Sequence, residues 1–172
     1  MMKRFVFPLC LCLALGIGLL MTGCGAYSFT GASISPEVET VTVETFPNNA
    51  DIVVPTLSQV FTEKMKDKFL RETRLNLVRR DGDLTFSGAI VDYRIAPASV
   101  QSGEQAAQNR VTISIDVVYE NLYEPDQNFE QRFSNFRDFP ANIDPNSVEN
   151  EMIEEITEMI IQDIFNKSVN NW

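Results

Sequence analysis

Val111-Thr112-Ile113-Ser114-Ile115 opens the stretch that decides the fold of this chain, and Asp116-Val117-Val118-Tyr119-Glu120 completes it. Apolar side chains alternate with polar ones throughout, and Val118 alone breaks the polar series. A period of two residues predicts a β-strand that buries one face and leaves the other in water. Sheets built from such strands are typically antiparallel and carry their helices on one face.

Four more strands are predicted around this one, over residues 38–44, 75–80, 84–96 and 129–139. Asp81-Gly82 suits a type I′ turn, so the second and third strands are expected to form a hairpin. Gly88 is expected to mark a bulge in the third strand. The apolar residues predicted to share one face of that strand are Ala89, Val91, Tyr93 and Ile95, with Asp92 and Arg94 on the other. In the last strand a change of phase between Phe133 and Phe136 predicts a second bulge.

Two amphipathic helices are predicted, the first over residues 55–73 and the second over 146–168. Thr56 and Gln59 have capping-box spacing in the first helix, and Asn146 and Glu149 are the expected cap pair of the second. The apolar side chains that recur at helical spacing are Leu57, Val60, Phe61, Met65 and Phe69, then Val148, Met152, Ile156, Met159, Ile160 and Ile164. The glutamates of the second helix are interpreted as a solvated face rather than as a metal or acid–base site.

These elements predict an α+β fold with the order β-α-β-β-β-β-α. We expect a two-layer sandwich in which both helices pack on one face of a mostly antiparallel sheet of four to five strands. Residues 37–172 are enough for a single domain, and a chain of this size buries a substantial core without disulfides.

The first 24 residues have the layout of a lipoprotein signal. A basic start, 1–4, precedes a 16-residue apolar run, 5–20, and Leu20-Met21-Thr22-Gly23-Cys24 resembles a bacterial lipobox. We expect residues 1–23 to be a signal peptide, Cys24 to be acylated, and 24–36 to form a lipidated tether. The alternatives are a transmembrane helix, which wants about 20 apolar residues, and an ordinary signal peptide beside an incidental Cys24.

The amino-acid composition excludes several classes of functional site. The chain contains no histidine, which excludes His-centred triads and the HExxH zinc motif. Removal of 1–23 would leave Cys24 as the only cysteine and 12 basic against 24 acidic residues, a net charge of −12. Such a charge argues against nucleic acid as a partner. We therefore expect no enzyme centred on histidine or a thiol, no cofactor and no metal site.

Several segments, taken together and in order, resemble the LptE family of lipopolysaccharide-transport lipoproteins in its Bacteroidota form. These segments are Cys24-Gly25-Ala26-Tyr27-Ser28-Phe29-Thr30-Gly31-Ala32-Ser33, Asn109-Arg110-Val111-Thr112-Ile113, Asp163-Ile164-Phe165-Asn166 and Asn171-Trp172. The resemblance implies a non-enzymatic role and a two-helix, one-sheet domain held by its lipid at the outer membrane, facing the periplasm. It also implies that the domain plugs an LptD-like β-barrel and helps that barrel to assemble and to deliver lipopolysaccharide.

Three sets of residues are candidates for contact. Tyr27 and Phe29 lie beside the anchor and could meet the membrane interface or a partner. Ser102 and Gly103 lie in the polar loop 97–108, which suits the wet lumen of a barrel. The basic residues that could bind lipopolysaccharide phosphates are Arg79, Arg80, Arg94 and Arg110, although ion pairs on the sheet would explain them equally.

Two other functions remain open from the residues alone. One is a tethered carboxylate-dependent hydrolase, which requires a cleft with two acidic residues of shifted pKa. The other is a pilot lipoprotein that docks on a different secretion machine. The family segments favour the barrel partner over both.

Overall fold

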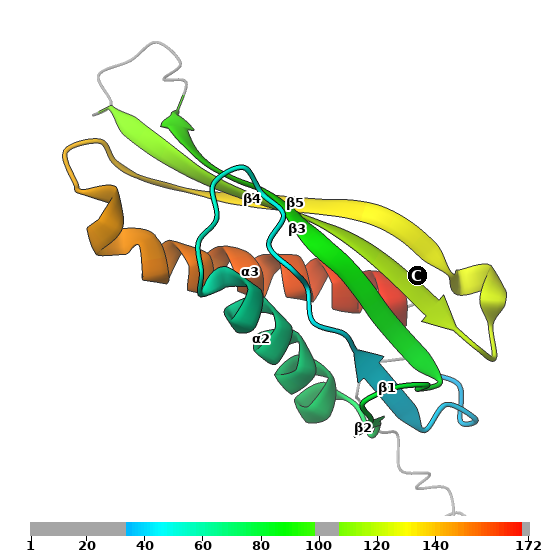
Figure 1. Ribbon diagram of the computed structural model, residues 1–172. Coiled ribbons are helices and arrows are strands. Elements are labelled where there is room, and N and C mark those ends of the chain that lie inside the picture. The colour runs from blue at the N-terminus through cyan, green and yellow to red at the C-terminus, as the bar shows by residue number, and fades with distance from the viewer. Residues whose placement is uncertain (1–33, 99–106, 170–172) are drawn as a thin grey trace, which may run out of the picture. The chain divides into compact units, whose positions relative to one another are not determined.

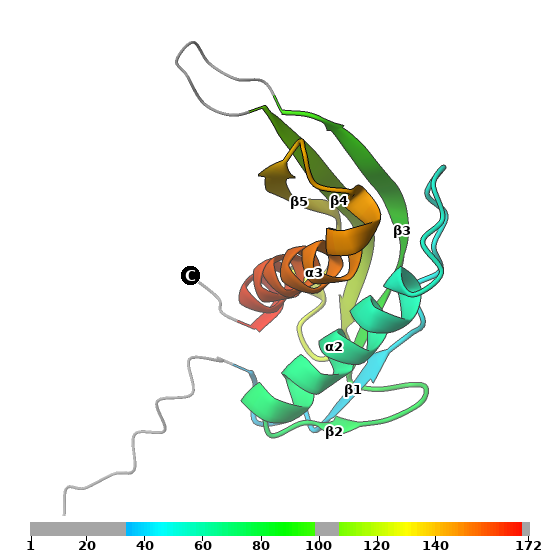
Figure 2. The ribbon, with the colours of Figure 1, turned by 90° about the vertical axis from the view of Figure 1, so that its left-hand side faces the viewer.

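The computed structural model of the chain describes residues 34–98 and 107–169 (Figure 1). The elements are β1 Thr40–Val43, α2 Leu57–Glu72, β2 Asn76–Leu77, β3 Leu84–Pro97, β4 Gln108–Asn121, the short 3-10 turn η2 Pro125–Gln127, β5 Phe129–Pro140 and α3 Pro145–Val169. The α+β fold and the order of its elements are confirmed. Both helices lie on one face of a five-stranded sheet, as Figure 2 shows.

The sheet is mixed, with the strand order β2-β1-β3-β4-β5. The two long pairs, β3–β4 and β4–β5, are antiparallel as expected, whereas β1 runs parallel to both β2 and β3. The physical reason lies in β1 itself. Val41, Thr42 and Val43 are all buried, so this short strand needs a neighbour on each side. Helix α2 supplies the crossover that a parallel β1–β2 pair requires.

The predicted Asp81-Gly82 hairpin is therefore wrong, because β1 separates β2 from β3. The backbone at Asp81 does adopt a positive φ of 55°, but Gly82 does not share it. Glycine is required at position 82 for another reason. Its N–H donates to Thr42 Oγ1 at 3.0 Å, and a Cβ here would lie 2.7 Å from the Thr42 nitrogen.

The bulge in β3 lies between Ile90 and Asp92, not at Gly88. The bulge changes the phase of the strand, so the predicted facing is wrong up to this point: Ile90 is fully buried while Ala89 and Val91 are only partly so. Tyr93 stays in the core as predicted, but Ile95 is exposed. Gly88 instead combines φ +148° with a close approach: a Cβ would lie 2.0 Å from the Asp116 carbonyl oxygen.

Strand β4 confirms the alternation that predicted it. Its core side chains, each at most 1% exposed, are Val111, Ile113, Ile115, Val117 and Tyr119. On the other face Thr112 and Ser114 are buried rather than wet, because these short side chains lie in a strand flanked by longer ones from β3 and β5. The predicted bulge in β5 is wrong. The β4–β5 register is continuous, and Phe136 points away from the helices.

The helices pack as their sequence pattern predicts, although their caps differ. Leu57, Phe61, Met65 and Phe69 are fully buried in α2, and the predicted stripe of α3 is buried or partly buried. Thr56 makes no side-chain cap, so the α2 capping box is not formed. In α3 the cap is Asp144, whose Oδ1 accepts the Asn146 N–H at 3.0 Å.

Aromatic rings join the two layers. Phe165 of α3 contacts Phe69 of α2, which contacts Phe86 of β3, with ring centroids 5.3 and 4.7 Å apart. The series continues across the sheet from Phe86 to Tyr119 and on to Phe129. Since each ring buries a large apolar area, this row is one connection between helices and sheet.

Candidate functional site

Several predicted contact residues lie outside the part of the chain that the structure describes. They are Cys24, Tyr27, Phe29, Ser102 and Gly103. The two arms that lead to the loop are described: Pro97 pairs with Asn109, and the Ala98 N–H donates to the Gln108 carbonyl at 2.8 Å. The last four residues of β3, 94–97, are exposed, so this end of the hairpin is not covered by the helices.

The four candidate arginines do not form one patch. Arg79 and Arg80 follow β2 and line an open cleft of about 700 Å³ beside the end of β1. Lys66 of α2 adds a third basic side chain to the cleft, and Glu44 adds an acidic one. Among the described residues no ion pair involves Arg79 or Arg80, so their charges remain available to an anionic ligand.

Arg94 and Arg110 lie instead on the sheet face opposite the helices, which we call the outer face. Arg94 pairs with Asp92 on the same strand, at 3.3 Å. Arg110 makes two hydrogen bonds to Asp138, of 2.7 and 2.8 Å, and its guanidinium lies 3.6 Å from the centre of the Phe136 ring. The Nε and Nη2 groups of Arg110 are therefore both engaged by Asp138. Of the two alternatives, an ion pair on the sheet describes this arginine better than a site for lipopolysaccharide phosphates.

A second cross-strand pair extends the pattern along the outer face. Arg132 of β5 holds Asp116 of β4 through hydrogen bonds of 2.6 and 2.8 Å. Between the two arginine pairs, the Ser114 hydroxyl donates to the Ser134 hydroxyl. The outer face thus presents a ladder of directly opposed, charge-compensated pairs, which is the favourable arrangement on an exposed sheet.

The electrostatics follow from these contacts. Hydrogen bonds from Arg132 lower the pKa of Asp116, and those from Arg110 lower the pKa of Asp138. The pKa values of both arginines are raised by the same bonds. Each carboxylate and each guanidinium is held in its charged form, so this ladder stays neutral in sum over the physiological pH range although the chain carries a net charge of −10.

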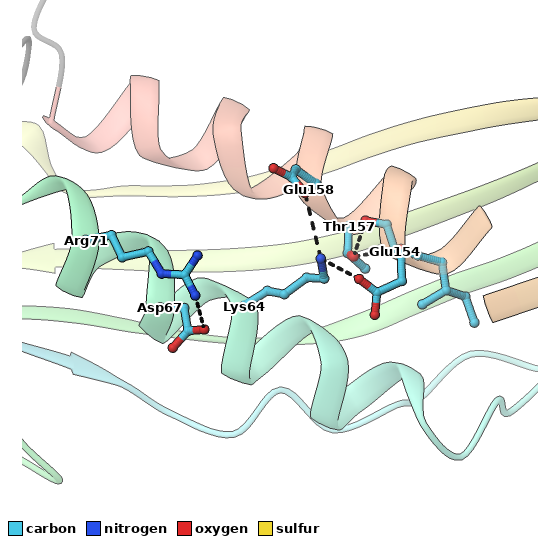
Figure 3. Close-up of polar contacts among 7 residues, drawn as sticks. Lys64, Asp67, Arg71, Glu154, Thr157 and Glu158 are labelled. Carbon is cyan, nitrogen blue, oxygen red and sulfur yellow. Dashed lines mark hydrogen bonds and ion pairs between the residues drawn. The ribbon is translucent and has the colours of Figure 1, made fainter. Parts of the chain in front are cut away.

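The solvent side of the helix layer carries a second set of charges (Figure 3). Lys64 of α2 reaches two glutamates of α3, Glu154 at 2.5 Å and Glu158 at 3.7 Å. Arg71 pairs with Asp67 within α2. A shallow groove of about 200 Å³ runs between these side chains. Glu154 and Glu158 therefore link α3 to α2, besides facing solvent as predicted.

In the described ranges the shifted carboxyl pKa values belong to Asp83, Asp116 and Asp138, and all three are lowered by hydrogen bonds. A general acid needs the opposite shift. In residues 34–98 and 107–169 no group of three or more acidic, cysteine or histidine side chains is placed to hold a metal. Of the helices described, neither is long and apolar enough to cross a membrane.

Asp83 is a structural residue that the sequence pattern missed. Its Oδ2 accepts hydrogen bonds from the Glu39 N–H and from the N–H and hydroxyl of Thr40, at 2.9, 2.9 and 2.8 Å. Its own carbonyl accepts the Leu122 N–H at 3.0 Å. Asp83 therefore links the start of β1, the loop after β2 and the β4–β5 turn at one end of the domain. The only signal in the sequence was an Asp beside a glycine turn.

Solved structures of other proteins resemble the fold of this domain. The protein CT253 of Chlamydia trachomatis matches with a TM-score of 0.53 at 7% identity, over 78% of this chain and 99% of that one. A homologue of the neuraminyllactose-binding hemagglutinin of Helicobacter pylori matches at 0.50 and 10% identity, over 82% and 88%. A minor lipoprotein of Acinetobacter baumannii matches at 0.48 and 9%, over 77% and 97%. No curated protein matches the chain.

The chain belongs to the LptE family of lipopolysaccharide assembly, whose model matches residues 38–168. This range begins at Val38, just before β1, and ends at Ser168, one residue before the end of α3. The whole described fold therefore lies within the family domain, and the resemblance read from the sequence is confirmed.

Proposed function

We propose that this protein is an outer-membrane lipoprotein, anchored through Cys24, that occupies the lumen of a large β-barrel lipopolysaccharide translocon. In that position it helps the barrel to assemble and to deliver lipopolysaccharide to the cell surface. Membership of the lipopolysaccharide-assembly family over residues 38–168 is the observation that carries this proposal.

Two features of the fold support a place inside a barrel. Strand β3 has 14 residues, and about 3.3 Å per residue gives it a length near 46 Å. That exceeds the hydrocarbon thickness of a bilayer, about 30 Å. The outer face is polar and charge-compensated, which suits the polar interior of outer-membrane barrels.

Affinity purification from detergent-solubilised outer membranes tests the partner. We expect a large β-barrel protein as the main co-purifying species. A secretin, or no partner, would overturn the proposal in favour of the pilot-lipoprotein alternative. Intact-mass measurement of the same sample tests the anchor, since Cys24→Ser should lose the acyl groups that the natural chain carries.

The outer face can be tested separately by a charge-swap cycle. Arg110→Asp and Asp138→Arg each place like charges opposite one another, and each should reduce the recovery of the barrel. The double variant restores the ion pair with its two charges exchanged. It should again recover the barrel if the outer face contacts the barrel through its shape and its lack of net charge. If all three variants recover as much barrel as the natural chain, the outer face is not part of the interface.

We propose the hairpin loop as a second contact, because its arms project past the helices. Replacing residues 99–106 by a short turn should leave the unfolding transition unchanged, since the Ala98 N–H already closes the two arms by donating to the Gln108 carbonyl at 2.8 Å. The same variant should co-purify less barrel. Unchanged recovery would exclude the loop, including Ser102 and Gly103.

Lipopolysaccharide itself would bind at the cleft of Arg79 and Arg80 rather than on the outer face. The Arg79→Gln/Arg80→Gln variant should bind less lipopolysaccharide than the natural domain, because two uncompensated charges are lost. Arg94→Gln/Arg110→Gln is the matched control, since it removes the same charge from side chains already paired with Asp92 and Asp138. Equal binding by both variants would dismiss the cleft.

A further inference from the structure

Two apolar side chains project into solvent from the turn between β4 and β5. Leu122 is 68% exposed, the largest fraction among the exposed large apolar residues in the described part of the chain, and Tyr123 beside it is 48% exposed. Such a pair exposes apolar surface to water at a cost of free energy. None of the functions assigned so far uses it.

The turn that carries this pair is fixed by its own hydrogen bonds. The side chain of Asn121 is buried, and its Oδ1 accepts the N–H groups of Tyr123 and Glu124, both at 3.0 Å. The Asn121 N–H donates in turn to Asn128 Oδ1 at 2.7 Å. Since the backbone is held from both sides, Leu122 and Tyr123 are presented outward at a fixed place.

The turn lies at the end of the domain where the anchored chain enters. The Leu122 N–H donates to the Asp83 carbonyl, and the Asp83 carboxylate holds Glu39 and Thr40 at the start of β1. From Cys24 to Glu39 the chain has 15 residues, which span at most about 50 Å. The opposite end of the sheet, where the β3–β4 hairpin lies, is about 40 Å away from this end along β3. A tether of 15 residues with random-coil statistics spans only about 20 Å on average. An acyl anchor therefore holds this end nearer to the bilayer than the hairpin end.

We propose that Leu122 and Tyr123 insert into the interfacial region of the bilayer that holds the lipid anchor. The inference rests on the proposed acylation of Cys24. Leucine and tyrosine suit this region because one is apolar and the other has an apolar ring with a polar end. Glu120, Glu124 and Asp126 flank the pair in the sequence with negative charge, so the turn suits zwitterionic lipids such as phosphatidylethanolamine better than anionic ones.

A lipid-quenching experiment tests this contact. The full chain carrying Leu122→Cys is labelled with an environment-sensitive fluorophore and reconstituted in phosphatidylethanolamine vesicles that contain a spin-labelled lipid. Acylated Cys24 does not react with the label, and the natural chain, labelled in parallel, measures the signal of any Cys24 that is not acylated. Val53→Cys, at a residue 60% exposed, is the matched control, because the bridge between Asn48 and Ile90 places its loop well along β3 from Leu84.

We expect the label at position 122 to be quenched roughly threefold more strongly than the label at position 53, as insertion near the headgroups requires. Equal quenching at the two positions, or none at position 122, overturns the membrane contact whether or not the chain is acylated. Quenching at position 122 in a chain whose mass shows no acyl group supports the contact and refutes the anchor. The two proposals are thus separated by one mass measurement.

Discussion

Thr40 and Asp83 hold each other through reciprocal hydrogen bonds. The Thr40 hydroxyl donates to the Asp83 carboxylate at 2.8 Å, and the Asp83 N–H donates back to the Thr40 hydroxyl at 2.9 Å. These residues are 43 positions apart in the sequence, and their contact closes the end of the domain that carries the entering chain. Because β1 is only four residues long, this contact supplements a short ladder.

Asp83→Ala should destabilise the domain by about 1–2 kcal/mol, because it leaves the N–H groups of Glu39 and Thr40 without their acceptor. Chemical denaturation measures the free energy of unfolding. Asp81→Asn is the control, because it removes a neighbouring exposed charge while asparagine tolerates the positive φ of 55° at this position. It should cost less than Asp83→Ala. A cost equal to that of the control would contradict the linking role of Asp83.

The same aspartate predicts a pH dependence. Hydrogen bonds, first from Glu39 and then from Thr40, lower the pKa of Asp83 below its ordinary value of 3.8. The folded form therefore favours the carboxylate, so this contribution to stability is complete above the unfolded pKa and is lost as the pH falls through the folded pKa. Asp83→Asn should lose less stability than the natural chain between neutral pH and pH values below about 3.8. Parallel curves for the two chains would refute the effect.

Phe86→Ala should cost about 3–5 kcal/mol, because its fully buried ring contacts Phe69 and Tyr119 at the centre of the aromatic row. Phe136→Ala is the matched control, since it removes the same ring from an outer-face position that is 43% exposed. Urea unfolding should separate the two variants clearly. Similar midpoints would mean that the row does not connect the layers.

Gly88→Ala should destabilise the domain by about 3 kcal/mol or more, because it combines a disfavoured backbone angle with a steric clash. A Cβ would lie 2.0 Å from the Asp116 carbonyl and 2.8 Å from the Phe46 ring. The reverse change next door, Ala89→Gly, should cost no more than about 1 kcal/mol. Thermal unfolding tests both, and a low soluble yield confined to the Gly88 variant agrees with the prediction.

Lys64→Ala should weaken the contact between the helices by about 0.5–1 kcal/mol at low salt, since it leaves Glu154 and Glu158 facing each other without a cation. The loss should shrink as salt is added. Arg71→Ala removes an exposed pair within one helix and should be nearly neutral. Unfolding measured at two salt concentrations distinguishes the two variants.

Much of the fold could be predicted from local patterns. The alternation in Val111–Glu120 and the helical spacing of Leu57, Phe61 and Phe69 predicted elements whose buried faces the structure confirms. The prediction of which side chains face the core was wrong where the alternation of a strand was interrupted. The bulge after Ile90 shifts the phase of β3 by one residue. The predicted phase therefore holds at Tyr93 but assigns Ala89, before the bulge, to the wrong face.

The candidate site was predicted only in part. Four arginines were named, but their sequence positions could not show that Arg110 would lie opposite Asp138 while Arg79 and Arg80 would line a cleft. Pairing across strands depends on register, and register depends on contacts between distant segments. Asp116, Arg132 and Asp83 were missed for the same reason.

The sequence by itself determined the elements, their order and the family, because alternation, helical spacing and a few ordered segments are properties of neighbouring residues. Only the tertiary structure decided that β1 lies between β2 and β3, which ruled out the Asp81-Gly82 hairpin. It also decided that Asp83 joins the entry of the chain to the turn at Leu122 and Tyr123. The physical reason is that a buried strand needs a hydrogen-bonded neighbour along each of its two edges. The sequence pattern of one segment does not show which other segments supply these neighbours.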